Sequence, residues 1–546
     1  MISLPLSSAN RRLRKQVKNW CSATRHRLES LPPRPNQAKS TGQSKMPAAA
    51  AYSVRLYYSA IVATMGFFAY GYHLGEFNNI STLLPCKDPN WPETAPPEPY
   101  LGISLPVCIP MTRVQFSFAN AIFPLAGVLG AMASGPMSHS LGRVRAMMYL
   151  TLPLALSPIA LALANNYAWL LVGRILAGIG AIGFSTIVPV YLSEISPPHL
   201  RGRVGNISSA MINVGLAIAS LTGWFWAASA PSWRSIVGFT LLTSVVQMVG
   251  LYFCAESPAW LEGAGRRAEA DAVRRSLGHD LTLVAMHDDI ELDRANAASG
   301  SEGDESKGLS LPPPHTEEEA TPRTESMSVL QLLRDPEYRR SIVILVLAHS
   351  AQQLSGINTY FVYSFFILTL VLTPEQAGVF YLAFAFCNIP INYFPGLIVD
   401  RFGRRPLILG TMAAMSLCAA LFTVSVVIKA PVMSIIMFVG AVTVFALGLS
   451  NVPFILMGEV TDARSVAAAS TVALVTNTLS SFVVLFVFPL LLDSLHEYTF
   501  LFFAGYLAIS GVALAAVLPE TRGRSNPDVM AELKLGIRWT RTAVAG

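Results

Sequence analysis

The sequence predicts an all-α, polytopic membrane protein with twelve transmembrane helices in two six-helix halves. Charged residues make up 13% of the chain, against about 25% in soluble domains, and the mean hydropathy is +0.47. Apolar segments of about 20 residues, long enough to cross a bilayer as helices, are centred near residues 65, 124, 155, 180, 217, 245, 352, 388, 417, 445, 479 and 508. A polar stretch at 262–338 separates the first six segments from the last six.

The same pattern divides the chain into five parts. Residues 1–53 are rich in Arg and Lys and have no apolar core, so we expect a disordered tail and no cleavable signal peptide. A six-helix bundle at 54–261, with a long outward loop at 79–112, precedes the polar linker. The linker at 262–338 combines helices with an acidic, disordered insertion. A second bundle at 339–519 and a tail at 520–546 complete the chain.

Basic residues predict the orientation of the spans. Arg143, Arg201 and Arg404 all lie in even-numbered short loops. Because Arg and Lys are enriched in cytoplasmic loops, we expect those loops and both termini to be cytoplasmic. The net charge of +6 then belongs mainly to these faces, and it does not indicate nucleic-acid binding.

Two cysteines stand apart from those in the spans. Cys86 and Cys108 both lie in the long outward loop, where an oxidising compartment would allow them to form a disulfide. The sequence leaves open whether they pair. The sequon Asn79-Ile80-Ser81 lies in the same loop, but so close to the first span that glycosylation of Asn79 stays equally open.

An internal repeat places arginines and acids at the inner ends of both halves. Gly142-Arg143 follows span two, and Gly403-Arg404-Arg405 follows span eight. Span four ends at Glu194 and span ten at Glu459. We expect inner-face ion networks that hold the halves together when the cavity opens outward, built from Arg143, Glu194, Arg201, Glu256, Asp400, Arg404, Arg405 and Glu459. The alternative is ordinary topogenic charge at helix ends.

The seventh span carries amide side chains at mid-membrane depth. Residues 341–370 contain no charged side chain, and Gln352, Gln353 and Asn358 lie near their centre. Burying such groups costs free energy unless they are hydrogen-bonded. On a regular helix Gln352 and Asn358 would be about 600° apart and would not share a face. The intervening Ser355-Gly356 therefore predicts a break in the helix.

Six motifs in order resemble those of the sugar porters of the major facilitator superfamily, the group that contains the facilitative glucose transporters. The resemblance covers roughly residues 54–525. The motifs are Gly173-Arg174, Pro189 to Glu194 with Arg201-Gly202, Glu256 to Leu261, Gln352 to Asn358, Asp400 to Arg405, and Pro519 to Gly523. The long outward loop and Gly71-Tyr72-His73 are similar to a fungal branch of the family, some of whose members are vacuolar.

This resemblance implies a carrier for a monosaccharide, a hexose such as glucose, that works by alternating access and is not an enzyme. It implies no cofactor and no metal. It assigns sugar contacts to Gln352, Gln353, Asn358, Asn388 and Asn477, and an outer gate to Tyr360, Phe361 and Tyr363. The chain departs from the family at Ser209, where a Gln is expected, and at Phe454, where a Trp is expected. We still expect both to contact the sugar, Ser209 through a water and Phe454 with its apolar face. The competing explanation is that the amides join helices to one another.

The mode of transport depends on the first span. Family symporters carry an Asp at the position of His73, and facilitators carry a neutral residue. Glu76 lies one turn further on, and Arg174 of span four can reach toward both, so the three form a candidate coupling cluster. We expect facilitated diffusion. The alternatives are proton-coupled sugar symport, a polyol carrier, and a non-transporting sugar sensor, although only about 27 residues follow Pro519 and sensors commonly have very long tails.

The expected partners follow from this function. They are the sugar, the lipid bilayer and, if transport is coupled, protons; no nucleic acid is expected. We expect a functional monomer, and a multi-pass protein of the plasma membrane or the vacuolar membrane.

Overall fold

The computed structural model describes residues 54–81, 83–86, 98–100, 102–197, 200–226, 232–278, 327–393, 402–462, 464–524 and 526–534. The predicted basic tail, the acidic insertion and Asp400 lie outside the described residues.

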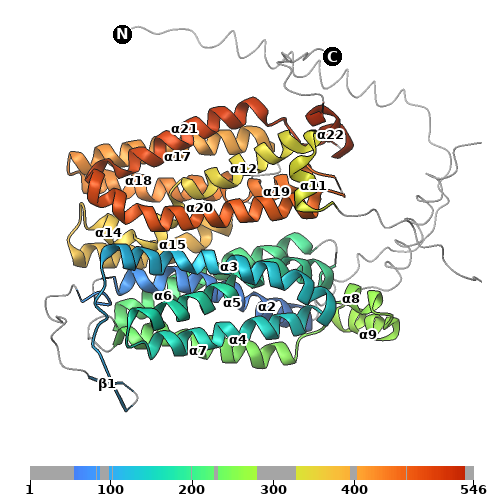
Figure 1. The fold of residues 1–546 in the computed structure, drawn as a ribbon, viewed down its shortest axis with the longest axis horizontal. Helices are drawn as coiled ribbons and strands as arrows, with labels where there is room; N and C mark the ends of the chain where they lie inside the picture. Colours follow the sequence, from blue (N-terminus) through green and yellow to red (C-terminus); the bar gives the residue numbers. More distant parts are fainter. Residues whose placement is uncertain are drawn as a thin grey trace, which may run out of the picture. The chain divides into compact units, whose positions relative to one another are not determined.

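Six long helices form the N-terminal half, drawn in blue to green in Figure 1. They are α2 (Val54–Asn79), α3 (Arg113–Leu141), α4 (Arg143–Ala162), α5 (Tyr167–Ile195), α6 (Arg201–Trp226) and α7 (Trp233–Tyr252). Glycines allow α2 and α6 to touch backbone to backbone, as small residues do between membrane helices. A Cβ on Gly71 would lie 1.9 Å from the Ile212 carbonyl oxygen, and one on Gly215 would lie 2.0 Å from that of Phe68.

The C-terminal half also contains six spans, but two of them are interrupted. The seventh consists of α12 (Arg339–Leu354), α13 (Ile357–Val362) and α14 (Ser364–Leu368). The tenth consists of α18 (Pro431–Val444), the π-helical η3 (Phe445–Leu449) and α19 (Val452–Glu459). The others are α15 (Pro374–Tyr393), α17 (Arg404–Val427), α20 (Val466–Leu495) and α21 (Thr499–Val517), with the short η4 (His496–Tyr498) before α21. Figure 1 shows the two halves as neighbouring bundles of nearly parallel helices.

Length and composition support a membrane-spanning chain. In the described residues, eight helical stretches are long and apolar enough to cross a bilayer. One of these, Val466–Val517, contains both α20 and α21. The eight do not include α2, which carries His73, Glu76 and two asparagines, α12, which has only 16 residues before the break, or α15. The interrupted tenth span is among the eight, as the stretch Pro431–Glu459.

The predicted break in the seventh span lies at the expected residues. Helix α12 ends at Leu354, and Gly356 adopts a φ of 82°, in the left-handed region that glycine tolerates best. The chain then re-enters a helix at Ile357, so Asn358 falls in the first turn of α13. The tenth span is also interrupted, where η3 gives way to α19 with Pro453 in its first turn.

Short elements cover the two ends of the bundles. At one end lie α8 (Pro258–Gly263), α9 (Arg267–Leu277), α11 (Val329–Arg334), η2 (Pro336–Tyr338) and α22 (Asn526–Lys534). This end carries Arg143, Glu194, Glu256, Arg404 and Glu459, and we call it the arginine face. At the other end β1 (Glu98–Tyr100) pairs antiparallel with β2 (Ile103–Leu105), with Glu98 opposite Leu105. We call this end the hairpin face.

The hairpin is fixed to the N-terminal half. Cys86 and Cys108 are joined by a disulfide, with an S–S distance of 2.07 Å. The buried Arg234 guanidinium donates to the carbonyl oxygens of Ala162, Ala164 and Pro106 at 2.7, 2.8 and 2.6 Å. Burial lowers the accessibility of these carbonyls to water, so the arginine supplies the partners they need. The loop therefore belongs structurally to the helices α4 and α7 beneath it.

Candidate functional site

Four of the five predicted amides form one continuous hydrogen-bonded chain. Asn358 Nδ2 donates to Gln353 Oε1 at 2.8 Å, and Gln353 Nε2 donates to Asn477 Oδ1 at 3.0 Å. Asn477 Nδ2 in turn donates to Gln352 Oε1 at 2.5 Å. We call these four residues the amide chain. The break at Gly356 makes it possible, because without the break Gln353 and Asn358 would point in different directions.

Both ends of the amide chain are anchored in the C-terminal half. Gln352 Nε2 donates to the carbonyl oxygens of Leu449 and Ser450 at 2.9 and 2.8 Å, at the end of the π-helical segment of the tenth span. At the other end Asn358 Nδ2 also donates to Ser481 Oγ at 2.6 Å. Because each amide orients its neighbour, the polar groups are held in a fixed arrangement before any solute binds.

His349 and Phe454 extend the amide chain on one side. His349 lies one turn before Gln352 and is fully buried, with Nδ1 3.3 Å from Asn477 Nδ2. Its ring meets Phe454 edge-on at a centroid distance of 5.2 Å. Among the described residues, His349 Nε2 has no hydrogen-bond partner. Phe454 is 43% exposed, so an apolar ring lies beside the polar groups.

The fifth predicted amide, Asn388, is not part of the amide chain. It lies on α15 and is fully buried, and its Nδ2 donates to Asn213 Oδ1 on α6 at 2.6 Å. Asn392, one turn further along α15, joins the same pair. Sequence reasoning missed Asn213 and Asn392, although both pairs Ser209/Asn213 and Asn388/Asn392 show polar residues four positions apart in an apolar helix. Ser209 itself is exposed.

The three predicted gate residues do not all face the same way. Tyr360 packs within the C-terminal half, its ring 5.0 Å from that of Phe438 and 5.6 Å from that of Phe500. This placement does not suit a gate against the N-terminal half. Tyr363 donates to the Leu485 carbonyl oxygen at 2.9 Å and lies near Ser117 of α3. Phe361 stacks on Phe384 of α15 at 6.4 Å.

The direct contact between α2 and the seventh span is made by Asn78. Its Nδ2 donates to Ser364 Oγ at 3.0 Å, and its Oδ1 accepts from the Phe365 backbone N–H at 3.1 Å. Nearer the hairpin face, Arg113 of α3 forms an ion pair with Asp493 of α20. The two halves are therefore joined toward the hairpin face by hydrogen bonds and charge.

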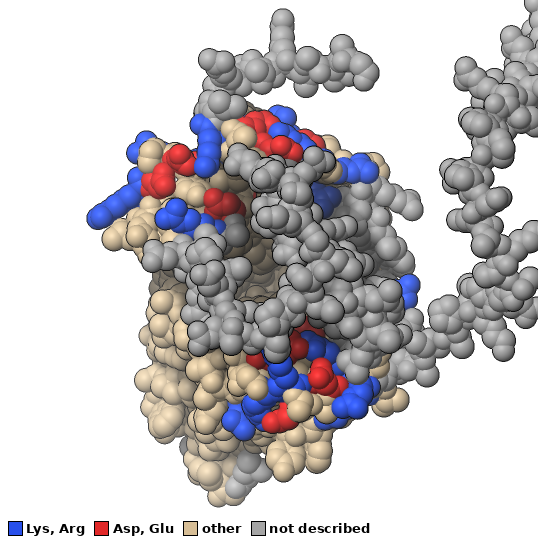
Figure 2. All heavy atoms as spheres, turned by 90° about the vertical axis from the view of Figure 1, so that its right-hand side faces the viewer, with Lys and Arg blue, Asp and Glu red and all other residues tan. Residues whose placement is uncertain are grey.

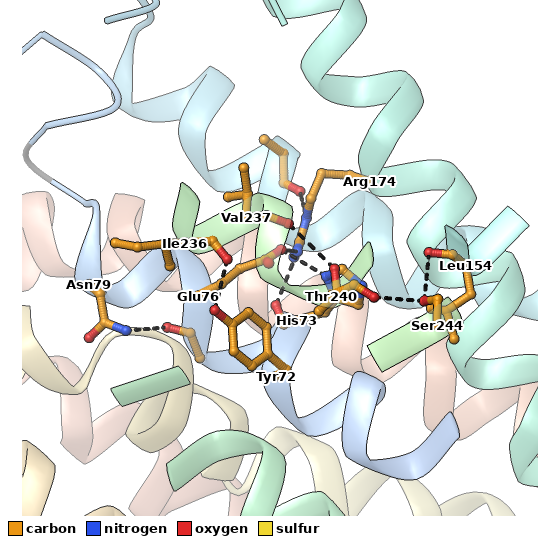
Figure 3. A network of polar contacts seen from close by, with 12 residues as sticks. Tyr72, His73, Glu76, Asn79, Leu154, Arg174, Ile236, Val237, Thr240 and Ser244 are labelled. Atoms are coloured by element: carbon orange, nitrogen blue, oxygen red, sulfur yellow. Dashed lines mark hydrogen bonds and ion pairs between the residues drawn. The ribbon is translucent and has the colours of Figure 1, made fainter. Parts of the chain in front are cut away.

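A buried charged cluster lies inside the N-terminal half (Figure 3). His73 Nδ1 is 2.9 Å from Glu76 Oε1, and Arg174 Nη1 donates to the same oxygen at 3.0 Å. Arg174 also lies over the rings of Phe77 and Phe123, 4.3 and 4.8 Å from their centroids. All three charged or titratable side chains are at most 2% exposed. Glu76 Oε2 and His73 Nε2 have no hydrogen-bond partner among the described residues.

The predicted ion networks of the arginine face form within each half. The Arg143 guanidinium donates two hydrogen bonds, of 2.9 and 2.8 Å, to the Glu194 carboxylate. Arg404 Nε donates to Glu459 Oε1 at 2.9 Å. Figure 2 shows the charged side chains of this face in two separate groups, one on each half. These bonds of Arg143 and Arg404 each stay within one group, and Asp400 of the predicted network lies outside the described residues.

Two glutamates complete these networks by capping helices. Glu256 Oε1 accepts from the backbone N–H of Arg143 at 2.9 Å, at the start of α4. Glu520 does the same for Arg404 at 3.0 Å, at the start of α17. Burial raises the pKa of Glu256, although hydrogen bonds from the backbone of Ser257, Val144 and Arg143 oppose that shift. Glu520 was missing from the predicted network, but the repeat of Glu256-Ser257-Pro258 and Glu520-Thr521 could have indicated it.

The remaining predicted network residues contribute less. Arg405 Nη2 donates to the Ala515 carbonyl oxygen at 2.8 Å rather than to Glu459. Arg201 starts α6 as an exposed side chain and forms no ion pair with described residues.

Comparisons with known proteins agree with this architecture. The family model of the sugar (and other) transporters matches residues 59–531. The chain is 30% identical over 499 residues to the human facilitated glucose transporter member 4 of solute carrier family 2, covering 86% of this chain and 89% of that protein. It is 26% identical over 468 residues to a probable metabolite transport protein of Saccharomyces cerevisiae, covering 85% of this chain and 92% of that protein.

A solved structure shows the same fold. The xylose transporter XylE from E. coli, in a partially occluded inward open conformation, matches with a TM-score of 0.66 at 19% identity, covering 87% of this chain and 100% of that one. Two six-helix halves with neutral amides buried between interrupted helices define a membrane carrier of the major facilitator fold. The chain belongs to the sugar (and other) transporter family, as a sugar porter of that superfamily.

Proposed function

We propose that this protein carries a monosaccharide, a hexose such as glucose, across a membrane by alternating access and facilitated diffusion. The observation that carries the proposal is the amide chain at the break of the seventh span. A sugar presents hydroxyl groups that both donate and accept, and neutral amides match both roles without holding the solute by charge. The partly exposed Phe454 offers an apolar face for the C–H side of the ring.

The contacts between the halves support an inward-facing state. Asn78 and Arg113 tie the halves together toward the hairpin face. The charged groups of the arginine face stay within their own halves. The positive-inside rule then makes the arginine face cytoplasmic. A membrane-impermeant maleimide applied to intact cells should label Ile103→Cys of the hairpin and not Arg266→Cys; the reverse pattern would contradict this orientation.

Uptake into proteoliposomes tests the carrier function. Purified wild-type protein should transport labelled D-glucose, and Asn358→Ala and Gln353→Ala should each lower kcat/KM by about 10- to 100-fold, because each leaves an amide partner unpaired. Thr471→Val on α20 is the control, because Thr471 is exposed and its hydroxyl donates only within its own helix, to Ala467. If the wild-type protein takes up no monosaccharide, the proposal is refuted. Uptake of sorbitol in place of hexoses would favour a polyol carrier.

Proton-coupled symport is the second candidate, favoured by the cluster of His73, Glu76 and Arg174. A buried carboxylate with one unpartnered oxygen, next to a histidine, has the chemistry to take up and release a proton. Under an inward proton gradient, symport would accumulate sugar above equilibrium, and Glu76→Gln would abolish the accumulation. Facilitated diffusion gives equal concentrations on both sides with or without the gradient.

A further inference from the structure

Asn213 supplies an amide where the N-terminal half lacks the expected glutamine. It lies on α6 one turn after Ser209 and therefore on the same side of the helix. Its Nδ2 donates to the Ser209 carbonyl oxygen at 2.8 Å, within its own helix. This bond fixes the side chain and leaves Oδ1 directed at α15. The side chain is only 7% exposed, so that oxygen must find a partner inside the protein.

The partner is an amide assigned to the sugar. Asn388 Nδ2 donates to Asn213 Oδ1 at 2.6 Å, and Asn392 Nδ2 lies 3.3 Å from the same oxygen. Asn392 Nδ2 also donates to Asn388 Oδ1 at 2.9 Å. Both polar groups of the Asn388 side chain are thus occupied, and the residue is fully buried. Each of these two groups has capacity for one further hydrogen bond, but the bonds to Asn213 and Asn392 fix the orientation of the amide.

The bond also crosses the boundary between the halves. Helix α6 belongs to the N-terminal half and α15 to the C-terminal half, and the two pack along each other. The amide chain differs in this respect, because all of its members lie in the C-terminal half. Among the hydrogen bonds between described residues, only that of Asn388 ties one of the five predicted amides to a side chain of the opposite half.

We propose that Asn213 is an internal competitor of the sugar, which occupies Asn388 in the empty carrier and has to be displaced when a sugar hydroxyl takes its place. This inference rests on the proposed function. A sugar hydroxyl offers the same kind of acceptor as Asn213 Oδ1, so the exchange replaces one hydrogen bond by another. The empty site thereby keeps its buried amides satisfied, and the affinity for sugar is lower than the number of amides suggests.

Equilibrium binding of D-glucose to the purified carrier tests the competition. In Asn213→Val, the amide of Asn388 lacks its acceptor in the empty state and regains one only from the sugar. The Kd for D-glucose should therefore fall about three- to tenfold, the range set by one hydrogen bond. An unchanged Kd would mean that the bond persists when sugar is bound and merely joins the helices. A raised Kd would mean that Asn213 itself holds the sugar; both results overturn the proposal.

A double-mutant cycle separates release of Asn388 from general loosening. In an Asn388→Val background, Asn213→Val should leave the Kd within twofold, since no amide remains to be released. Thr151→Val in α4 is the matched control, because this buried hydroxyl donates to Met147 in its own helix and its loss should not tighten binding. Asn213→Ser, too short to reach α15, carries the same expectation if the valine variant does not fold. Absence of hexose binding and uptake by the wild type would instead refute the proposed function.

Discussion

The two halves handle buried polar groups in opposite ways. The C-terminal half buries neutral amides that satisfy one another in the amide chain. The N-terminal half buries a charged cluster, in which Arg174 is held by Glu76 and by aromatic rings. Neutral amides can release a hydrogen-bonded solute readily, whereas a buried charge is costly to expose or to leave unpaired. The difference teaches that the amide chain and the buried charged cluster, the two candidate sites, are built in separate halves.

The largest effect should come from breaking the charged cluster. Arg174→Leu removes the guanidinium from the buried Glu76 carboxylate, which keeps only its contact with His73, and should destabilise the folded protein by about 3–5 kcal/mol. The double variant Arg174→Leu/Glu76→Gln should recover much of the loss, because it removes the stranded charge. Thermal unfolding of the detergent-purified variants measures both. A single variant as stable as the wild type would show that the cluster is not electrostatically coupled.

A smaller effect, expressed in transport rather than folding, should follow from cutting the amide chain at its middle. Asn477 links Gln352 to Gln353, so Asn477→Ala should leave Gln352 Oε1 and Gln353 Nε2 without their Asn477 partner and lower kcat/KM for D-glucose by about 10- to 100-fold. The neighbouring Thr476→Val, whose hydroxyl donates to Val472 in the same helix, is the control. Equal losses in the two variants would indicate a disturbed helix instead of a lost site.

The break that assembles the amide chain should be sensitive to one methyl group. Gly356→Ala places a Cβ at a φ of 82° and 3.0 Å from the Phe503 ring, and should cost about 1–2 kcal/mol of stability. Gly410→Ala in α17 provides the contrast, since an added Cβ meets nothing within 4 Å there and alanine favours a helix. Unfolding temperatures compare the two, and an equal response would contradict a special role for Gly356.

The smallest effect concerns the capping glutamate of the arginine face. Because burial raises the pKa of Glu256, its contribution to stability is fully present below the unfolded pKa of about 4.3 and is lost as the pH rises through the folded value. The Tm of the wild type relative to Glu256→Gln should therefore fall by about 1–2 °C between mildly acidic and neutral buffer. A difference that grows with pH would show that the backbone hydrogen bonds outweigh burial.

The sequence predicted those features that depend on local chemistry. The break at Ser355-Gly356 follows from the helical period and the separation of Gln352 from Asn358, and the structure has it there. The pairings of Arg143 with Glu194 and of Arg404 with Glu459 follow from the internal repeat. Such features need only a short stretch of chain or two copies of one motif.

Features that depend on the packing of helices distant in the sequence could not be predicted from it. Asn213 meets Asn388 across 175 residues of sequence, and no local pattern relates α6 to α15. Tyr360 was expected at the gate, but the rotation of α13 after the break points it at Phe438 in its own half. One sequence also encodes every conformational state of a carrier. The sequence therefore does not say in which state the arginine networks join the two halves.

The glycine contact between α2 and α6 determines where this molecule can bend. Because Gly71 and Gly215 bring two backbones together with no side chain between them, relative sliding of these helices would drive main-chain atoms into each other. We therefore expect α2 and α6, the first and fifth spans, to move as one rigid body. Rocking of the halves would then strain the boundary between α6 and α15, where Asn388 and Asn392 both donate to Asn213.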